Sequence, residues 1–257
     1  MMKKMSVTEL SEVINQVLKG TIDFKNPEYT GEVYHTYFIF CWQEIMKNLD
    51  LSPEGPNVLE IASGQSDPVP QALEKYSRGS GTYVTANLNK KLTAGMLKKT
   101  KNLNIEVKII EDNARNLEKY YPENSFDLVS FQHAVNDMIQ TIAAQNEGID
   151  TINNDWYDIL PLMIEKVNNY FRQNRLQQKT GQEFIDQIKV CSHLLKKGGF
   201  LVFNTHVFQM DLDSGYIPEL YENYINLARE WITESDLPLK EKKLPGFDKQ
   251  WWLILKK

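Results

Sequence analysis

Cysteine is scarce in this chain of 257 residues, which contains only two. Cys41 and Cys191 stand far apart in apolar patterns of helical period, without the spacing of a metal site or a disulfide framework. Paired carboxylates at ligand spacing are also missing, so the sequence predicts no metal centre. Two buried free thiols are typical of a cytoplasmic protein, and this is the localisation that we expect.

Long apolar runs are missing as well. A membrane-spanning helix needs roughly 20 consecutive apolar residues, and no stretch approaches that length. Residues 1–5 include two lysines but not the apolar core of a signal peptide. We therefore expect no membrane partner.

The chain has no excess of basic residues. Its 29 lysines and arginines oppose 34 aspartates and glutamates, which gives a formal net charge of −5. Proteins that bind RNA or DNA usually present a basic face, so we expect no nucleic-acid partner. With 42% apolar and 25% charged residues, the composition is ordinary for one globular domain with one sizeable core.

Phosphate-binding glycine motifs are absent from the most informative stretch, residues 57–68, which reads NVLEIASGQSDP. Its first five residues suit a buried parallel strand, and the small residues 62–64 allow a tight turn. Asp67 and Pro68 then indicate the start of a helix. The turn carries neither Gly-x-Gly-x-x-Gly nor Gly-Lys-Ser/Thr. Glu60, near the end of the strand, instead suits a ligand with positive charge or amino donors.

This stretch resembles the first motif of class I S-adenosylmethionine-dependent methyltransferases, whose usual form is Val-Leu-Glu-Ile-Gly-Ser-Gly. Ala62 stands at the first glycine of that motif, and Gly64 is retained. Three later segments are similar to further elements of the family: the Asp-Ala-x-x-Leu element at 111–117, Phe-Asp-Leu-Val at 126–129, and Leu-Lys-x-Gly-Gly-x-Leu-Val at 195–202. The resemblance implies an α/β fold with a doubly wound, seven-stranded, mostly parallel sheet and an antiparallel last strand.

Apolar spacing divides the chain into an N-terminal helical cap, residues 1–50, and a methyltransferase-like α/β domain, residues 51–257. The cap is expected to hold one helix after a capping box at 6–9 and another over 31–48. Within the α/β domain, residues 138–181 form a helical insert after the fourth strand, where a short connection would be usual. The insert suits a lid over a substrate pocket or, almost equally, a dimerisation surface, so a homodimer stays open.

The remaining elements follow from shorter patterns. A helix over 184–195 is expected to end at the glycines 198 and 199, before a fifth strand at 200–203. One helix around 220–231 and a hairpin of strands, 239–244 and 250–255, should close the chain. Asp127 is expected to fix the turn before the fourth strand.

The resemblance implies S-adenosylmethionine as the cofactor and assigns its contacts to the ends of four strands. The implied cofactor-binding residues are Glu60, Ala62, Ser63, Gly64, Asn87, Leu88, Asp112, Asn113, Ala114 and Gln132. Asn87 stands where the family has an acid that binds both ribose hydroxyls. The residue that contacts the adenine amino group is Asn113, in register with Ala114, or Asp112, one place earlier.

Histidines at strand ends are the candidates for catalysis. His133 and His206 follow the fourth and fifth strands, which are neighbours in this fold, and imidazole titrates near neutral pH. We select His133 as a general base, with Asp137 orienting it or holding an amine, and with His206 as a third catalytic candidate. His35 is expected in the same chamber. Candidate substrate-binding residues are Tyr29, Tyr34, Tyr37, Asn136 and Trp156.

The expected activity is in-line transfer of a methyl group to an oxygen or nitrogen of a small-molecule metabolite. Family members that methylate amino groups of nucleic acid carry Asn/Asp-Pro-Pro-Tyr/Phe after the fourth strand. Here residues 133–136 read His-Ala-Val-Asn, which favours a small acceptor. The alternative is an inactive subunit that binds the cofactor or a protein partner, which the residues at 62, 87 and 113 favour. A nicotinamide-dependent oxidoreductase ranks last, because the first loop lacks the required glycines.

Overall fold

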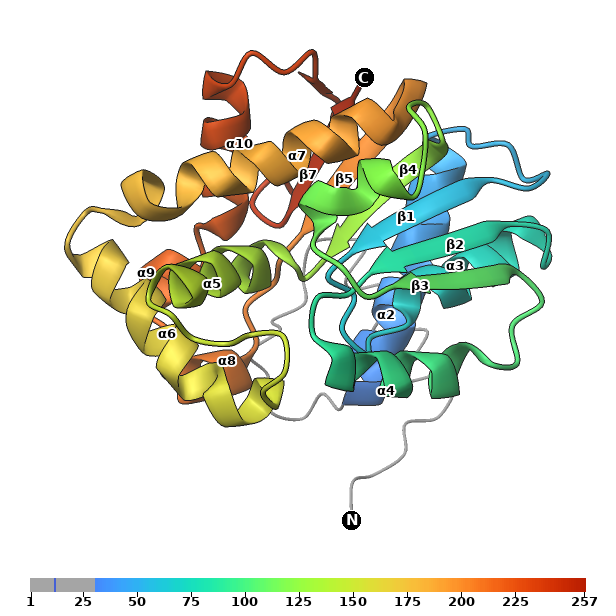
Figure 1. Ribbon diagram of the computed structural model, residues 1–257. Coiled ribbons are helices and arrows are strands. Elements are labelled where there is room, and N and C mark those ends of the chain that lie inside the picture. Colours follow the sequence, from blue (N-terminus) through green and yellow to red (C-terminus); the bar gives the residue numbers. More distant parts are fainter. Residues whose placement is uncertain (1–11, 13–30) are drawn as a thin grey trace.

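The computed structural model describes residue 12 and residues 31–257 of the chain. The capping box expected at 6–9, the helix after it and Tyr29 lie outside these residues. Within them the fold is a single seven-stranded sheet with helices on both faces (Figure 1).

The sheet has the strand order β3-β2-β1-β4-β5-β7-β6. Strands β1 to β5 run parallel to one another. At the other edge, β7 is antiparallel to β5, and β6 is antiparallel to β7. This is the doubly wound, mostly parallel sheet predicted from the sequence, and the prediction is confirmed. The strands are β1 (Asn57–Ile61), β2 (Thr82–Ala86), β3 (Glu106–Ile110), β4 (Phe126–Gln132), β5 (Leu195–Asn204), β6 (Lys240–Glu241) and β7 (Trp252–Lys256).

The α-helices flank the sheet, and they form three of the four connections between its parallel strands. They are α2 (Gly31–Asn48), α3 (Pro68–Ser77), α4 (Lys90–Thr100), α5 (Val135–Asn146), α6 (Trp156–Arg172), α7 (Gln182–Leu194), α8 (Gln209–Asp213), α9 (Pro218–Tyr221) and α10 (Tyr224–Glu234). A 3-10 helix, η1 (Ala114–Lys119), precedes β4, and a π-helical turn, η2 (Gln177–Gly181), leads into α7. In the described part of the chain, no helix has the length and hydropathy needed to cross a bilayer.

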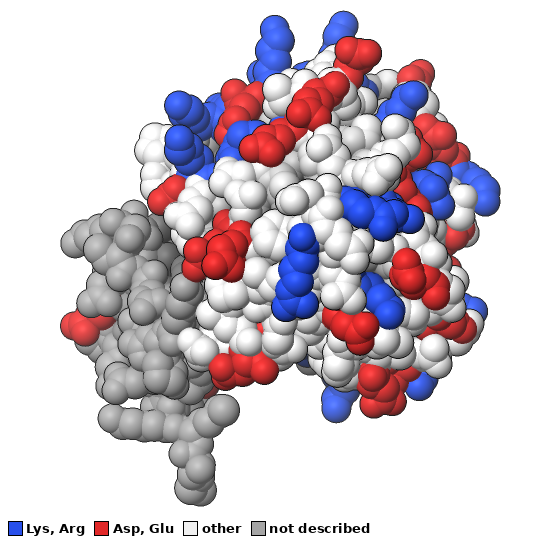
Figure 2. Space-filling view, turned by 90° about the vertical axis from the view of Figure 1, so that its left-hand side faces the viewer, with Lys and Arg blue, Asp and Glu red and all other residues white. Residues whose placement is uncertain are grey.

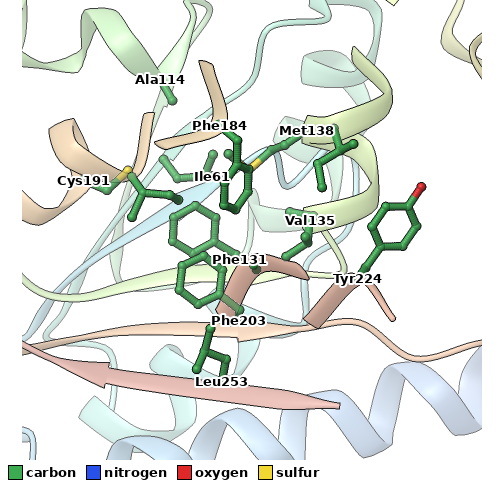
Figure 3. Packing of buried hydrophobic residues seen from close by; sticks show 14 of the residues in the cluster. Ile61, Ala114, Phe131, Val135, Met138, Phe184, Cys191, Phe203, Tyr224 and Leu253 are labelled. Atoms are coloured by element: carbon green, nitrogen blue, oxygen red, sulfur yellow. The ribbon is translucent and has the colours of Figure 1, made fainter. Parts of the chain in front are cut away.

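Each central strand sends alternate side chains to the two faces of the sheet. In β5, Leu201 and Phe203 belong to the core beneath α5, α7 and α10, whereas Phe200 and Val202 belong to the core beneath α2 and α3. On the first face, the rings of Phe131 and Phe203 stack at 4.1 Å, at the centre of the packing in Figure 3. Because both faces are covered, β1, β2 and β4 are buried at nearly every position, and the apolar residues among these positions made the strands predictable.

The connections between strands differ from the sequence-based expectation at three places. Helix α7 ends at Leu194, because Leu195 is already extended, and Gly198 adopts its φ of +82° inside β5 and does not cap the helix. The single helix expected at 220–231 is divided into α9 and α10. Strand β6 is much shorter than 239–244, because Pro238 and Pro245 flank it and cannot donate to a ladder.

Two carboxylates hold the ends of neighbouring elements together. Asp127 accepts the amide of Asn57 at 2.9 Å and the Nζ of Lys196 at 2.8 Å, so it joins the amino ends of β1, β4 and β5. This is the structural role expected for it. Asp67 precedes α3 as expected, but its side chain does not cap that helix; it instead accepts from Gln71 at 3.2 Å and lies 3.0 Å from Nε2 of His35.

Acidic and basic side chains alternate over the surface in Figure 2. No large patch of one sign forms on the face shown there. Cys41 and Cys191 are buried free thiols, as predicted.

Candidate functional site

A cavity of about 260 Å³ opens at the carboxyl ends of β1, β2 and β4. Ligands of doubly wound sheets bind at this edge, because the loops that leave the strands diverge there. Its lining brings together most of the site residues predicted from the sequence: Ala62, Ser63, Gly64, Asn87, Leu88, Asp112, Asn113, Ala114, Gln132, His133, Asp137 and Trp156. The cavity is therefore the candidate site.

The loop after β1 forms one side of the cavity. Ala62 and Gly64 both adopt left-handed backbone conformations, with φ of +55° and +57°. Ser63 is buried, and its Oγ lies 2.7 Å from the hydroxyl of Thr85. The side chain of Asn87 then closes the loop, since its Oδ1 accepts the Gly64 amide at 2.9 Å and its Nδ2 donates to the Gly64 carbonyl at 2.8 Å.

Glu60 does not line the cavity. Its side chain is fully buried within the sheet, and the hydroxyl of Tyr83 donates to Oε2. Burial raises the pKa of Glu60 to about 8. Its Oε1 contacts no hydrogen-bond donor among the residues described. The carboxyl thus lies within the sheet, outside the cavity lining, and its predicted contact with the cofactor stays a prediction.

Asp112 and Asn113 both line the cavity after β3, so the structure keeps both of the alternatives for the adenine contact. Asp112 is oriented by the amide of Asn113 and by Nδ2 of Asn116, each at 2.7 Å, and by the hydroxyl of Tyr120 at 3.0 Å. The hydrogen bond from Asn116 is the main reason that the pKa of Asp112 lies below its usual value. Asn113 caps η1 through Oδ1, which accepts the amide of Arg115 at 3.0 Å.

His133 lies at the end of β4 in a left-handed conformation, with φ of +54°, which is uncommon outside glycine and asparagine. Its Nδ1 accepts the backbone amide of His206 at 3.4 Å. The proton of the neutral ring is therefore on Nε2, which lies 3.3 Å from the hydroxyl of Tyr221 and 3.9 Å from Oδ2 of Asp211. Burial lowers the pKa of His133, so the neutral ring is the form present near pH 7.

Asp137 faces the cavity from the first turn of α5. The side chain is half-buried, and desolvation raises its pKa to about 8. Two neutral amides, Nδ2 of Asn136 at 2.8 Å and Nε2 of Gln140 at 2.9 Å, donate to Oδ1. Oδ2 accepts no hydrogen bond from the residues described, which leaves it available to a ligand.

The helical segment 138–181 supplies another wall of the cavity, through Met138, Thr141, Ile142, Gln145, Thr151, Trp156 and Tyr157. Asn89, after β2, donates from Nδ2 to the carbonyls of Thr151 and Asn154, both at 3.0 Å. Tyr157 accepts from Nε2 of Gln65 at 3.0 Å across the cavity. The segment is helical and borders the cavity; its role as a lid or as a dimerisation surface stays a prediction.

The other predicted site residues lie outside the cavity lining. Tyr34 packs on Phe208 at 4.7 Å between ring centroids, and Tyr37 lies 6.1 Å from the ring of His206. His206 is buried behind the cavity, among Phe38, Trp251 and Trp252. Asn136 is buried and acts on the site through Asp137. His35 contacts Asp67, so only His133 of the three expected histidines lines the cavity.

Several residues of the lining were not selected from the sequence, among them Gln65, Asn89, Gln145 and Tyr157. Gln65 and Asn89 stand in the short loops that follow β1 and β2, and this position is a usable signal. The positions of Gln145 and Tyr157 depend on how α5 and α6 pack over the sheet, and no local sequence pattern indicates that packing.

The charges of the cavity lining are of one sign. Asp112 and Asp137 line it, whereas the lining contains no lysine or arginine among the described residues. The same part of the chain contains no cluster of three or more potential metal ligands. A phosphate-bearing ligand would meet no cationic side chain here, while a ligand with positive charge would meet the Asp112 carboxylate and would favour the ionised form of Asp137.

Comparison with known proteins establishes the fold. No protein-family model matches the chain, and no curated protein has a significantly similar sequence. A SAM-dependent methyltransferase from Aquifex aeolicus superposes with a TM-score of 0.50 at 11% identity, over 98% of this chain and 98% of that one. The CurJ carbon methyltransferase gives a TM-score of 0.52 at 13% identity, over 96% of this chain and 66% of the other. The chain thus has the Rossmann-like fold of these proteins.

Proposed function

We propose that the protein is an S-adenosylmethionine-dependent methyltransferase that transfers a methyl group to a nitrogen or oxygen of a small molecule. The observation that carries the proposal is the charge of the cavity. At the ligand-binding edge of the sheet, two carboxylates and several neutral amides line a space without lysine or arginine. S-adenosylmethionine bears a sulfonium and an ammonium but no phosphate, so it suits this lining better than a dinucleotide does.

The residues of the chain fit this cofactor in position. Gly64 leaves open space toward Leu92, where the nearest atom to an added Cβ would be 3.5 Å away. The loop 62–66 and Gln132 would hold the amino-acid part, Asn87 and Leu88 the ribose, and Asp112 to Ala114 the adenine. Trp42 on α2 donates from Nε1 to Oε1 of Gln132, so the α2 helix orients that amide within the site.

When bound, the cofactor supplies a methyl group on a positively charged sulfur, which leaves as a neutral thioether. The chain then has to hold the acceptor in line with that methyl group and exclude water. Trp156 and Tyr157 cover the cavity, and Asp137 offers a carboxylate oxygen to the acceptor. His133 suits a general base only in part, because the lone pair of its neutral ring, at Nδ1, already accepts the His206 amide.

A second candidate function is a subunit that binds the cofactor without chemistry. The bonds of Asn87 favour it, since Oδ1 already accepts the Gly64 amide and the Ser63 hydroxyl and one N–H of Nδ2 is bound to Gly64, which leaves only the second N–H for a ribose hydroxyl. The fully formed cavity around Asp137 favours the enzyme. We also propose that the protein acts in the cytoplasm, on a small molecule and not on nucleic acid, and that the 138–181 segment covers the acceptor.

Measurements of methyl transfer and of cofactor binding distinguish the enzyme from the inactive subunit. The protein is incubated with methyl-tritiated S-adenosylmethionine and mixed small amines and phenols, and labelled products are separated by chromatography. If the protein is an enzyme, we expect a labelled product. The His133→Ala variant should then keep cofactor binding while its turnover falls. Cofactor binding without any labelled product would favour the inactive subunit. Unchanged turnover in His133→Ala would exclude a catalytic role for that histidine.

A further inference from the structure

The polar end of the cavity is built around one oxygen atom of Asp137. Oδ1 of this residue is held by Asn136 and Gln140, at 2.8 and 2.9 Å. Gln140 is itself oriented, because the buried hydroxyl of Tyr216 donates to its Oε1 and so leaves its amide group to face Asp137. Three side chains therefore fix the carboxyl so that Oδ2 is the oxygen offered to the cavity.

Among the residues that the structure describes, no lysine or arginine lines the cavity beside this carboxylate. The charged group that acts on it most is Asp211, which has the same sign. The other polar groups at this end are His133, whose neutral form is favoured by burial, and the hydroxyls of Tyr216, Tyr221 and Tyr224, all protonated near neutral pH. A carboxylate enclosed without a cation is unfavourable unless a bound ligand supplies the positive charge.

Two further acceptor atoms at this end lack donors. Oδ1 of Asn136 and the hydroxyl of Tyr224 are buried and form no hydrogen bond with the described residues. Asn136 is the direct neighbour of Asp137, and Tyr224 lies within electrostatic range of it. In Figure 3 the Tyr224 hydroxyl points away from the other labelled apolar side chains. Neither residue lines the cavity, and the Tyr224 hydroxyl donates no hydrogen bond to Asp137, so Oδ2 gains no donor from the side chains behind the lining.

Aromatic rings occupy the same cavity. Trp156 and Tyr157 line it together with His133. The faces of indole and phenol rings attract desolvated cations, so these rings strengthen the preference of the Asp137 carboxylate for a positively charged ligand. They also cover the hydrocarbon part of a small organic ligand.

We propose that the methyl acceptor is a small amine, bound as its ammonium ion with the nitrogen at Oδ2 of Asp137. The proposal rests on the methyltransferase function and narrows it from oxygen or nitrogen to nitrogen. The ammonium ion has no lone pair, so one N–H bond must break before methylation. Asp137 accepts that proton at Oδ2 as an O–H bond forms, and the neutral amine keeps the electron pair with which it attacks. The bound ammonium ion favours the ionised form of Asp137, and the carboxyl's pKa of about 8 before a ligand binds is nearer to that of an amine than an ordinary carboxyl's is, which suits this exchange.

The test compares amines with alcohols of the same skeleton: 2-phenylethylamine with 2-phenylethanol, cyclohexylamine with cyclohexanol, and ethanolamine with ethylene glycol. Affinities are measured by saturation-transfer NMR at pH 7.5, with and without S-adenosylhomocysteine. Wild-type protein should bind at least one amine about tenfold more tightly than its alcohol. In Asp137→Asn this preference should disappear, with a loss of about thirtyfold or more in amine affinity.

Asp211→Asn is the matched control, because it removes the same charge from the same cluster but Asp211 does not line the cavity. It should keep the preference for amines. Asp137→Asn retains an acceptor oxygen for Asn136 and Gln140, and an unchanged melting temperature would exclude unfolding as the cause of its loss.

Three results would overturn the amine proposal: equal binding of amines and alcohols, no binding of any amine, or an amine preference that survives Asp137→Asn. A fourth is a tenfold loss of S-adenosylhomocysteine affinity in that variant with amine binding intact, because Asp137 would then serve the cofactor. Failure of the wild type to bind S-adenosylhomocysteine at all would instead contradict the methyltransferase function, while amine binding without it remains measurable.

Discussion

The side chain of Asn87 bonds to both backbone polar groups of Gly64. Its Oδ1 accepts the Gly64 amide at 2.9 Å, and its Nδ2 donates to the Gly64 carbonyl at 2.8 Å. An aspartate, the residue expected here from the family resemblance, could accept the first bond but could not donate the second. The asparagine therefore stabilises the loop at the expense of the carboxylate that would bind a ribose.

Asn87→Asp should lower the stability of the protein and raise its affinity for the cofactor product. The new carboxylate would face the Gly64 carbonyl, and we expect the free energy of unfolding to fall by about 1–3 kcal/mol at pH 7. The deficit should shrink toward pH 4, where a protonated aspartate donates again. Affinity for S-adenosylhomocysteine should rise, because a carboxylate makes charge-assisted bonds to both hydroxyls. Urea denaturation at the two pH values and calorimetry measure these effects; a variant with unchanged stability would contradict the role of the Nδ2 bond.

Ala62→Gly should stabilise the protein. Ala62 has a φ of +55°, a conformation that costs a non-glycine residue about 1–2 kcal/mol and costs glycine little. Part of this gain is offset because glycine has more freedom in the unfolded chain, so we expect a net increase of about 0.5–1 kcal/mol in unfolding free energy. A lower melting temperature in the variant would show that the alanine methyl group makes a contact worth more than the strain.

Glu60→Gln should change how stability depends on pH. Burial raises the pKa of Glu60 to about 8 from about 4.5, so the folded state holds a proton that the unfolded state releases. This contribution to stability is complete below about pH 4.5 and is lost as the pH rises through 8. Glutamine has no such loss, so the stability difference, variant minus wild type, should increase from pH 5 to pH 8. Chemical denaturation at four pH values measures it, and a constant difference would mean that the carboxyl titrates normally.

Asn89→Asp should loosen the loop between α5 and α6. The aspartate keeps the oxygen that caps α4 at the amide of Lys91 but loses the donors to Thr151 and Asn154. Hydrogen exchange should therefore become faster in residues 150–156 and stay the same in α4. Asn89→Ala is the comparison, since it removes the cap as well and should also affect α4. Unchanged exchange at 150–156 in both variants would show that other contacts hold the loop.

Much of the fold could be predicted because buried strands are apolar and helices repeat at a fixed period. The bounds expected for α2 agree with the structure, and the seven-stranded, mostly parallel sheet with its antiparallel last strand followed from the family resemblance. The sequence was less informative where local signals compete with tertiary contacts. Gly198, for example, looks like a helix cap, but the bonds of β5 extend the strand back to Leu195.

The site was predictable at strand ends, since the topology brings those ends together. Ala62, Asn87 and Asp112 could be named because the family resemblance assigns the cofactor contacts to strand ends, and His133 because it follows the fourth strand, although their roles stay predictions. Residues whose location depends on tertiary packing could not be predicted from the sequence. Glu60 stands in a strand whose side chains alternate between the faces, and its burial beside Tyr83 depends on the pairing of β1 with β2.

Calorimetric titration with S-adenosylhomocysteine, with NADH as the control ligand, tests the central claim most directly. The Gly64→Ala variant should weaken binding at the cavity. Gly198→Ala is the control, because it introduces the same kind of backbone strain at the far end of the sheet, where an added Cβ meets no atom within 4 Å. We predict micromolar or tighter binding of S-adenosylhomocysteine by the wild type and by Gly198→Ala, weaker binding by Gly64→Ala, and none of NADH. Binding of NADH, or no binding of S-adenosylhomocysteine at high concentration, would contradict the account.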